Sequence, residues 1–141
     1  MIDHVNAFAL AVRDVKKCAE FYRDNLGFDL KVMENDFAYL MIGEKGGPGL
    51  ALVSFDGFAQ EIPDREIGLR AESIRPSYLA VFVEDTDREY EELSGKGVHF
   101  VVPPATRASG QRWAYFEDPE GNLWEISHFP KKQEAVAATT T

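Results

Sequence analysis

Leu10–Asp14, which reads LAVRD, returns 71 positions later as Val81–Asp85, which reads VFVED. These two segments belong to an internal repeat. Two further pairs occur in the same order at nearly the same offset: Phe37–Leu40 with Trp113–Phe116, and Leu50–Ser54 with Leu123–Ser127. Because each repeat is too small to bury a core well alone, we expect two equivalent modules that pack together. Any bound molecule is then expected where the modules meet.

The first repeat predicts a β-α-β-β-β module. The apolar run Ala7–Val12 is typical of a buried strand, and Asp14 is expected to cap a helix. Apolar residues then recur at helical spacing from Val15 to Leu26, and Gly27 suits the left-handed position that ends a helix. Three more strands are expected at residues 28–33, 37–42 and 50–55.

The second repeat predicts the same order of elements. The strand Ser77–Val83 precedes Asp85, the expected second helix cap, and further strands are expected at residues 98–102, 112–116 and 122–128. The predicted organisation is module one at 1–55, a connector at 56–76 whose mixed pattern allows a short helix, module two at 77–130 and a disordered tail at 131–141. The predicted fold class is α+β.

Composition narrows the functional classes. A net charge of −9 argues against nucleic acid and against an anionic membrane surface as partners. The single cysteine, Cys18, excludes an internal disulfide and fits a reducing compartment. The sequence shows no secretory signal peptide, and its apolar runs fall far below the roughly 20 residues that span a bilayer. We therefore expect a cytoplasmic protein.

Two motifs carry a family resemblance. Phe21–Phe28 (FYRDNLGF) and Tyr115–Ile126 (YFEDPEGNLWEI) resemble the glyoxalase / bleomycin-resistance / extradiol-dioxygenase group, also called the vicinal oxygen chelate (VOC) superfamily. The likeness covers about residues 5 to 128. It implies two βαβββ modules that form a curved mixed sheet around a cleft, often in a homodimer. It leaves the chemistry open, because members include lyases, isomerases, dioxygenases, thiol transferases and antibiotic-sequestering proteins.

The resemblance also implies where a metal would bind. Metal-dependent members use His, Glu and Gln at four positions, on the first and last strand of each module. Those positions here are Ala7, Leu52, Tyr78 and Glu125. Two cannot coordinate a metal and tyrosine is an uncommon ligand, so no metal and no other cofactor is expected, and a divalent ion is disfavoured. His4 does not restore the site, because its odd offset from Ala7 points it to the opposite strand face.

Glu125 and Tyr78 are the candidate catalytic residues. A carboxylate that faces an apolar cleft needs a partner or a changed protonation state, so Glu125 is either functional or held by a neighbouring arginine. Tyr78 replaces a ligand with a phenol that donates a hydrogen bond or stacks on a ring, or else it is an ordinary strand tyrosine. Both alternatives stay open.

The remaining candidates are ligand contacts. Strand alternation predicts that small and apolar residues line the pocket wall. Aromatic residues of matching strands either contact a planar ligand or belong to the core. A loop arginine either binds an anionic ligand at the cleft mouth or lies in solvent. These residues are Ala7, Ala9, Leu52 and Ser54 for the wall, Phe37, Tyr39, Trp113 and Tyr115 for the rings, and Arg107 for the loop.

Three functions follow, of which the sequence favours the first. The protein binds a small aromatic or cationic molecule without a metal, as bleomycin-resistance proteins do. Alternatively, it is a metal-dependent glyoxalase-type lyase or dioxygenase, or a metal-free enzyme that uses Glu125 as general base and Tyr78 as hydrogen-bond donor. The identity of the ligand, the presence of catalysis and the pairing of modules within one chain or between two stay open.

Overall fold

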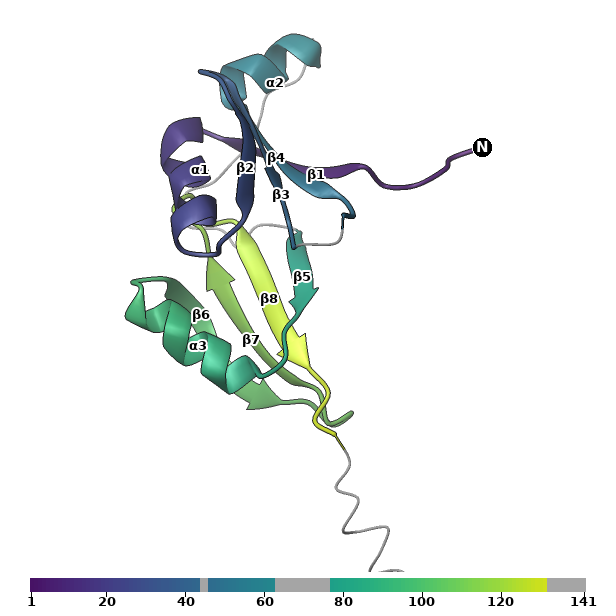
Figure 1. Cartoon of the computed structure of the whole chain (residues 1–141), viewed down its shortest axis with the longest axis vertical. Coiled ribbons are helices and arrows are strands. Elements are labelled where there is room, and N and C mark those ends of the chain that lie inside the picture. Colours follow the sequence, from purple (N-terminus) through teal and green to yellow (C-terminus); the bar gives the residue numbers. More distant parts are fainter. Residues whose placement is uncertain (44–45, 63–76, 132–141) are drawn as a thin grey trace, which may run out of the picture. The chain divides into compact units, whose positions relative to one another are not determined.

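A computed structural model describes residues 1–43, 46–62 and 77–131 (Figure 1). The chain divides into two compact units, Met1–Ser77 with Glu117–Leu123, and Tyr78–Phe116 with Trp124–Thr141. The predicted disordered tail beyond residue 131 and most of the predicted connector, residues 63–76, lie outside the described residues. No helix in the described part of the chain is long and apolar enough to cross a membrane.

The first unit has the predicted βαβββ order. Its sheet runs β1-β4-β3-β2, with β1 parallel to β4 and the other pairs antiparallel. The helix α1 packs against β2, β3 and β4 (Figure 1). A further helix, α2 (Phe55–Glu61), follows β4 at the start of the predicted connector. The bounds are β1 Ala7–Val12, α1 Val15–Asp24, β2 Asp29–Met33, β3 Phe37–Met41 and β4 Gly49–Ser54.

The ends of α1 form as its sequence predicts. The Asp14 carboxylate accepts the backbone N–H of Lys17 at 2.9 Å, which satisfies one of the free amides of the first turn. Gly27 has φ 74°, a left-handed conformation that favours glycine, just after the helix. The core lies between α1 and the sheet, and its fully buried members include Cys18, Tyr22, Ala38, Leu40, Leu50 and Leu52.

The register of β1 and β4 corrects one prediction. Ala7 pairs with Gly49, Ala9 with Ala51, and Leu10 with Leu52. Because side chains alternate along a strand and paired residues share a face, Leu52 lies on the face opposite to Ala7 and Ala9. The prediction that Leu52 lines a pocket wall with these alanines is therefore wrong.

Ser54 has the same parity as Leu52, so its predicted place in the wall is wrong for the same reason. Its hydroxyl accepts the backbone N–H of Gly57 at 3.0 Å and caps α2. The β4 residue that shares the face of Ala9 is Ala51. A shift of one residue in reading the repeat was enough to reverse the face.

The second unit repeats the architecture of the first. Its sheet runs β5-β8-β7-β6, which corresponds strand for strand to the first sheet. The elements are β5 Tyr78–Phe82, α3 Thr86–Gly95, β6 His99–Thr106, β7 Arg112–Glu117 and β8 Leu123–His128. The agreement confirms the predicted repeat.

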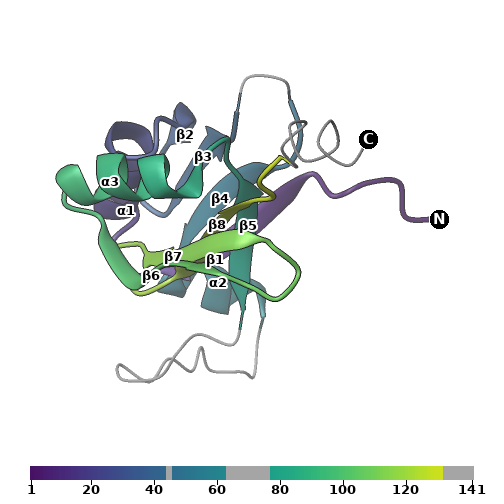
Figure 2. The ribbon, with the colours of Figure 1, turned by 90° about the horizontal axis from the view of Figure 1, so that it is seen from below.

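The strand β6 is longer than the predicted 98–102, because it continues through Pro103 and Pro104 to Thr106. Proline cannot donate a ladder hydrogen bond, and β6 tolerates two because it lies at the edge of its sheet. The loop between β6 and β7 extends beyond the sheet (Figure 2).

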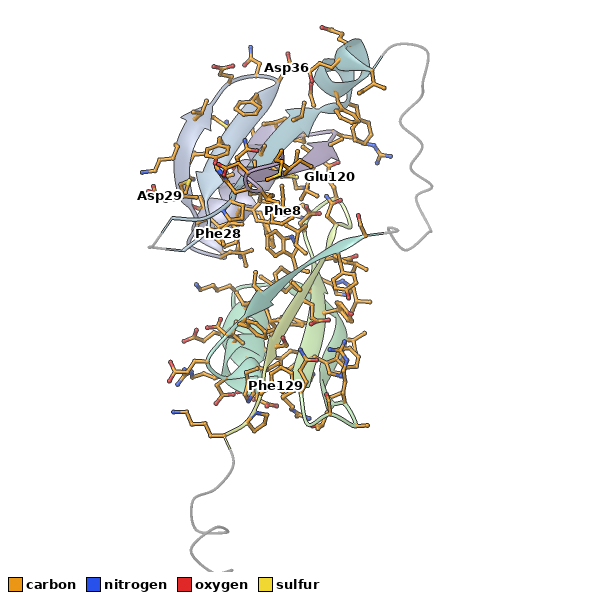
Figure 3. All side chains as sticks on the ribbon, turned by 90° about the vertical axis from the view of Figure 1, so that its right-hand side faces the viewer. Phe8, Phe28, Asp29, Asp36, Glu120 and Phe129 are labelled. Carbon is orange, nitrogen blue, oxygen red and sulfur yellow. The ribbon has the colours of Figure 1, made fainter. Side chains whose placement is uncertain are left out.

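The turn before β8 belongs to the first unit. Buried Asp118 accepts hydrogen bonds from the Tyr22 hydroxyl at 2.7 Å, from the Asn122 side chain at 2.8 Å, and from the backbone N–H groups of Glu120 and Asn122 at 2.8 and 2.9 Å. The turn thereby fixes Glu120 against this unit (Figure 3).

Glu120 in turn adds acceptors at the start of α1. Its carboxylate oxygens accept the backbone N–H groups of Arg13 at 2.6 Å and Asp14 at 2.8 Å. A negative charge at a helix N-terminus is favourable because the helix dipole is positive there. The turn of the second repeat therefore caps the helix of the first.

Candidate functional site

The candidate site lies on one face of the second sheet. On the other face, Trp124 of β8 stacks on Phe116 of β7 at 6.1 Å between ring centroids, and Phe116 packs against Phe100, which contacts Tyr90 of α3. Because neighbouring side chains of a strand point to opposite faces, Glu125 lies on the face away from α3. The β6–β7 loop reaches the same face through Arg107.

Glu125 is buried and paired with a guanidinium. Its side chain is 7% exposed, and its Oε2 accepts a hydrogen bond from Nη2 of Arg107 at 3.1 Å. The Arg107 side chain is 35% exposed. The hydrogen bond from Arg107 to Glu125 and the charge of that carboxylate together raise the pKa of Arg107. The pair therefore neutralises a charge that would be costly to bury alone.

Gln111 extends this polar network. Nη1 of Arg107 donates to Oε1 of Gln111 at 2.6 Å, and Nε2 of Gln111 donates to the Ser127 hydroxyl at 3.1 Å. The loop itself is closed by hydrogen bonds from Arg107 N–H to the Gln111 carbonyl at 2.9 Å and from Gly110 N–H to the Arg107 carbonyl at 2.8 Å. Arg107 is thus oriented by its own loop and by β8.

Three aromatic rings form a row of contacts that begins at the ion pair. The Arg107 guanidinium carbon lies 4.6 Å from the centre of the Trp113 ring, Trp113 contacts Tyr115 edge-on at 5.2 Å, and Tyr115 contacts Tyr78 edge-on at 5.4 Å. Tyr78 is half exposed. A cation over an indole face is attracted by the ring electrons.

The indole N–H of Trp113 is buried, and within the described residues it has no hydrogen-bond acceptor. An unsatisfied buried donor costs about 1–3 kcal/mol. The site retains this indole despite that cost, which fits a position where the ring face contacts a charged group.

Tyr115 is held as a neutral phenol. Burial, followed by hydrogen bonding with Glu125 and Tyr78, raises the pKa of Tyr115 to about 12. A carboxylate beside the hydroxyl favours the protonated form, because a phenolate there would face a like charge.

This shift predicts a loss of stability in alkaline solution. Below the ordinary phenol pKa of about 10, Tyr115 is protonated in both states and its contribution is fully present. As the pH rises from about 10 to 12, the unfolded chain releases this proton while the folded chain retains it, so stability falls. Urea unfolding at pH 9 and pH 11 measures the loss, and Tyr115→Phe is expected to lose less. Equal losses in the two proteins would contradict the assignment.

The structure brings together the predicted residues of the second unit, Glu125, Tyr78, Trp113, Tyr115 and Arg107. Arg107 pairs with Glu125, which is the alternative that the sequence left open for this carboxylate. Sequence reasoning missed Gln111 and Ser127. The parity of Ser127, two positions after Glu125, was the available signal.

Phe37 and Tyr39 belong to the first unit, where they share the sheet face of Ala7, Ala9 and Ala51. The Tyr39 ring lies directly over Gly49, and any side chain at that position would overlap the phenol. This face therefore combines small residues with two aromatic rings, and the prediction that these residues contact a planar molecule stays a prediction.

His128 and Arg112 have structural partners in the second unit. Nδ1 of His128 accepts the backbone N–H of Thr86 at 3.0 Å at the start of α3. Arg112 donates two hydrogen bonds to Asp87, at 3.0 and 2.8 Å. His4 is exposed beside Asp3.

The residues of this site do not fit a metal ion. Within the part of the chain that the structure describes, no three or more His, Cys, Asp and Glu side chains gather as ligands. In the first unit, the positions that the resemblance assigned to metal ligands, Ala7 and Leu52, carry only hydrocarbon side chains, as does Ala51.

Comparison with known proteins establishes the family. The model of the Glyoxalase/Bleomycin resistance protein/Dioxygenase superfamily matches residues 1–126, and the chain belongs to this superfamily. A solved glyoxalase/bleomycin resistance protein/dioxygenase from Nocardioides superposes with a TM-score of 0.75 at 26% identity, covering 94% of this chain and 91% of that chain. The fold class and the resemblance drawn from the sequence are confirmed.

Two relatives extend the comparison. The chain is 35% identical to the uncharacterized protein YraH of Bacillus subtilis (strain 168) over 118 residues. The aligned segment covers 83% of this chain and 91% of the relative. It is also 33% identical to a bleomycin resistance protein of Geobacillus stearothermophilus over 127 residues. That aligned segment covers 86% of this chain and 92% of the relative.

Proposed function

We propose that this protein binds a small aromatic or cationic organic molecule without a metal, in the manner suggested by its bleomycin resistance relative. The observation that carries the proposal is the pairing of buried Glu125 with Arg107, whose guanidinium lies over the Trp113 ring. Rings and a few oriented polar groups are the usual composition of a small-molecule site.

The enzymatic alternatives have less support. A general base must reach a proton of the substrate, whereas the Glu125 side chain is only 7% exposed and its Oε2 accepts a hydrogen bond from Arg107. A metal-dependent lyase or dioxygenase needs a ligand set that the described residues do not supply. The homodimer and the cytoplasmic location expected from the sequence stay predictions.

Binding in the presence of EDTA tests the proposal. We expect isothermal titration calorimetry to detect a saturable complex between the full chain and bleomycin, or another member of a panel of aromatic and cationic compounds, with EDTA present. The bound compound should be recovered chemically unchanged after incubation.

Two results would contradict it. One is binding that appears only when a divalent metal is added, which would favour the metal-dependent class. The other is chemical conversion of the bound compound by wild type but not by Glu125→Gln, which would favour the metal-free enzyme.

A further inference from the structure

The Arg107 guanidinium occupies a place that is built to receive a planar cation. It touches the carboxylate of Glu125 at 3.1 Å, lies over the Trp113 ring at 4.6 Å and donates to the amide oxygen of Gln111 at 2.6 Å. An anion, an aromatic face and a neutral acceptor are the groups that recognise guanidinium, amidinium and arylammonium ions. We call Glu125, Trp113 and Gln111 the cation seat.

Glu125 of the cation seat is more deeply buried than Arg107, which fills the seat in this structure. Glu125 and Trp113 come from β8 and β7 of the sheet, and the Glu125 side chain is 7% exposed. Arg107 follows the end of β6, and its side chain is 35% exposed. Its long side chain can leave the seat by rotation about its own bonds, whereas Glu125 and Trp113 are held in strands of the sheet.

We propose that the cation seat binds the cationic group of an organic ligand, and that Arg107 is an internal competitor which fills the seat when no ligand is bound. This inference rests on the proposed function of the same sheet face and names the chemical class of its ligand. Arg107 keeps the buried carboxylate paired in the free protein, and a planar cation takes over that pairing on binding.

Competition has a measurable consequence. A ligand that must displace an internal group binds with an affinity reduced by the fraction of time that the seat is open. Removal of the competitor therefore raises the affinity for a cation, whereas removal of a direct ligand contact lowers it. Replacing Arg107 therefore raises the affinity for a cation if Arg107 is a competitor, and lowers that affinity if Arg107 is a ligand contact.

Benzamidine, a planar aromatic amidinium, is the probe. We expect Arg107→Ala to bind benzamidine about tenfold or more tightly than wild type does, measured by calorimetry or by tryptophan fluorescence at pH 8. Benzamide, which has the same ring without the charge, should show no such gain. Adding Glu125→Gln to Arg107→Ala should abolish the gain, because the anion is then absent.

Arg112→Ala is the matched control. It removes a guanidinium from the same unit, but its partner Asp87 is 53% exposed and forms no seat, so benzamidine affinity should equal that of wild type. If Arg107→Ala does not fold, Arg107→Met keeps the apolar stem over Trp113 without the charge and is expected to show the same gain.

The possible results are distinct. Unchanged or weaker benzamidine binding by a folded Arg107 variant overturns the inference, as does benzoate binding by wild type that the variant loses, since Arg107 would then contact an anionic ligand. Either result leaves the proposed function intact if bleomycin or another panel compound still binds. Failure of every compound to bind any variant overturns the inference together with the proposed function.

Discussion

Replacing Asp118 with alanine is expected to lower the free energy of unfolding by about 3–5 kcal/mol, the largest loss that we predict for a single substitution. The buried carboxylate accepts four hydrogen bonds, from the Tyr22 hydroxyl, the Asn122 side chain and two backbone amides of its turn. The substitution removes the acceptor for all of them. It also releases the turn that holds Glu120 at the start of α1.

Urea unfolding followed by circular dichroism measures this effect. Asp87→Ala is the control, because Asp87 is exposed and pairs only at the surface with Arg112, so its loss should be clearly smaller. A loss below about 1 kcal/mol for Asp118→Ala would show that the four hydrogen bonds are not coupled to folding.

The second large effect concerns the ion pair of the candidate site. Arg107→Ala is expected to cost about 2–3 kcal/mol of unfolding free energy, because it leaves the carboxylate of Glu125 buried without its cation. Breaking a fully buried pair costs about 3–5 kcal/mol, and the partial exposure of Arg107 reduces that figure.

The double variant Arg107→Met/Glu125→Leu should recover stability to within about 1 kcal/mol of wild type, because an apolar pair replaces the buried charges at little cost. A double-mutant cycle over the two positions measures the coupling in the same urea experiments. Additive losses, with the double variant the least stable of the three, would mean that Glu125 finds another partner when Arg107 is absent.

Much of the fold could be predicted because its signals are local. The repeat sets the order of strands and helices, and Asp14 and Asp85 mark the helix starts because a carboxylate at the cap position accepts first-turn amides. The strand β6 was predicted too short because prolines usually end a strand, and nothing in the local sequence shows that β6 lies at a sheet edge.

The site was predictable in part. Alternation along β7 predicts that Trp113 and Tyr115 share a face, and the two rings contact each other edge-on. The prediction that Leu52 shares a face with Ala7 and Ala9 was wrong, because the relative register of β1 and β4 depends on backbone pairing. An error of one residue in that register reverses the face. The partner of Glu125 depends on the path of the β6–β7 loop, which strand periodicity does not describe.

The capping of α1 by Glu120 has a consequence for synthesis. The acceptor for the Arg13 amide lies 107 residues later in the chain. At translation rates of about 5–20 residues per second, a nascent chain waits roughly 5–20 s between making the helix and making its second cap. The amino-terminal half therefore leaves the ribosome without these hydrogen bonds at the start of α1, and we expect it to reach its final stability only when almost the whole polypeptide has emerged.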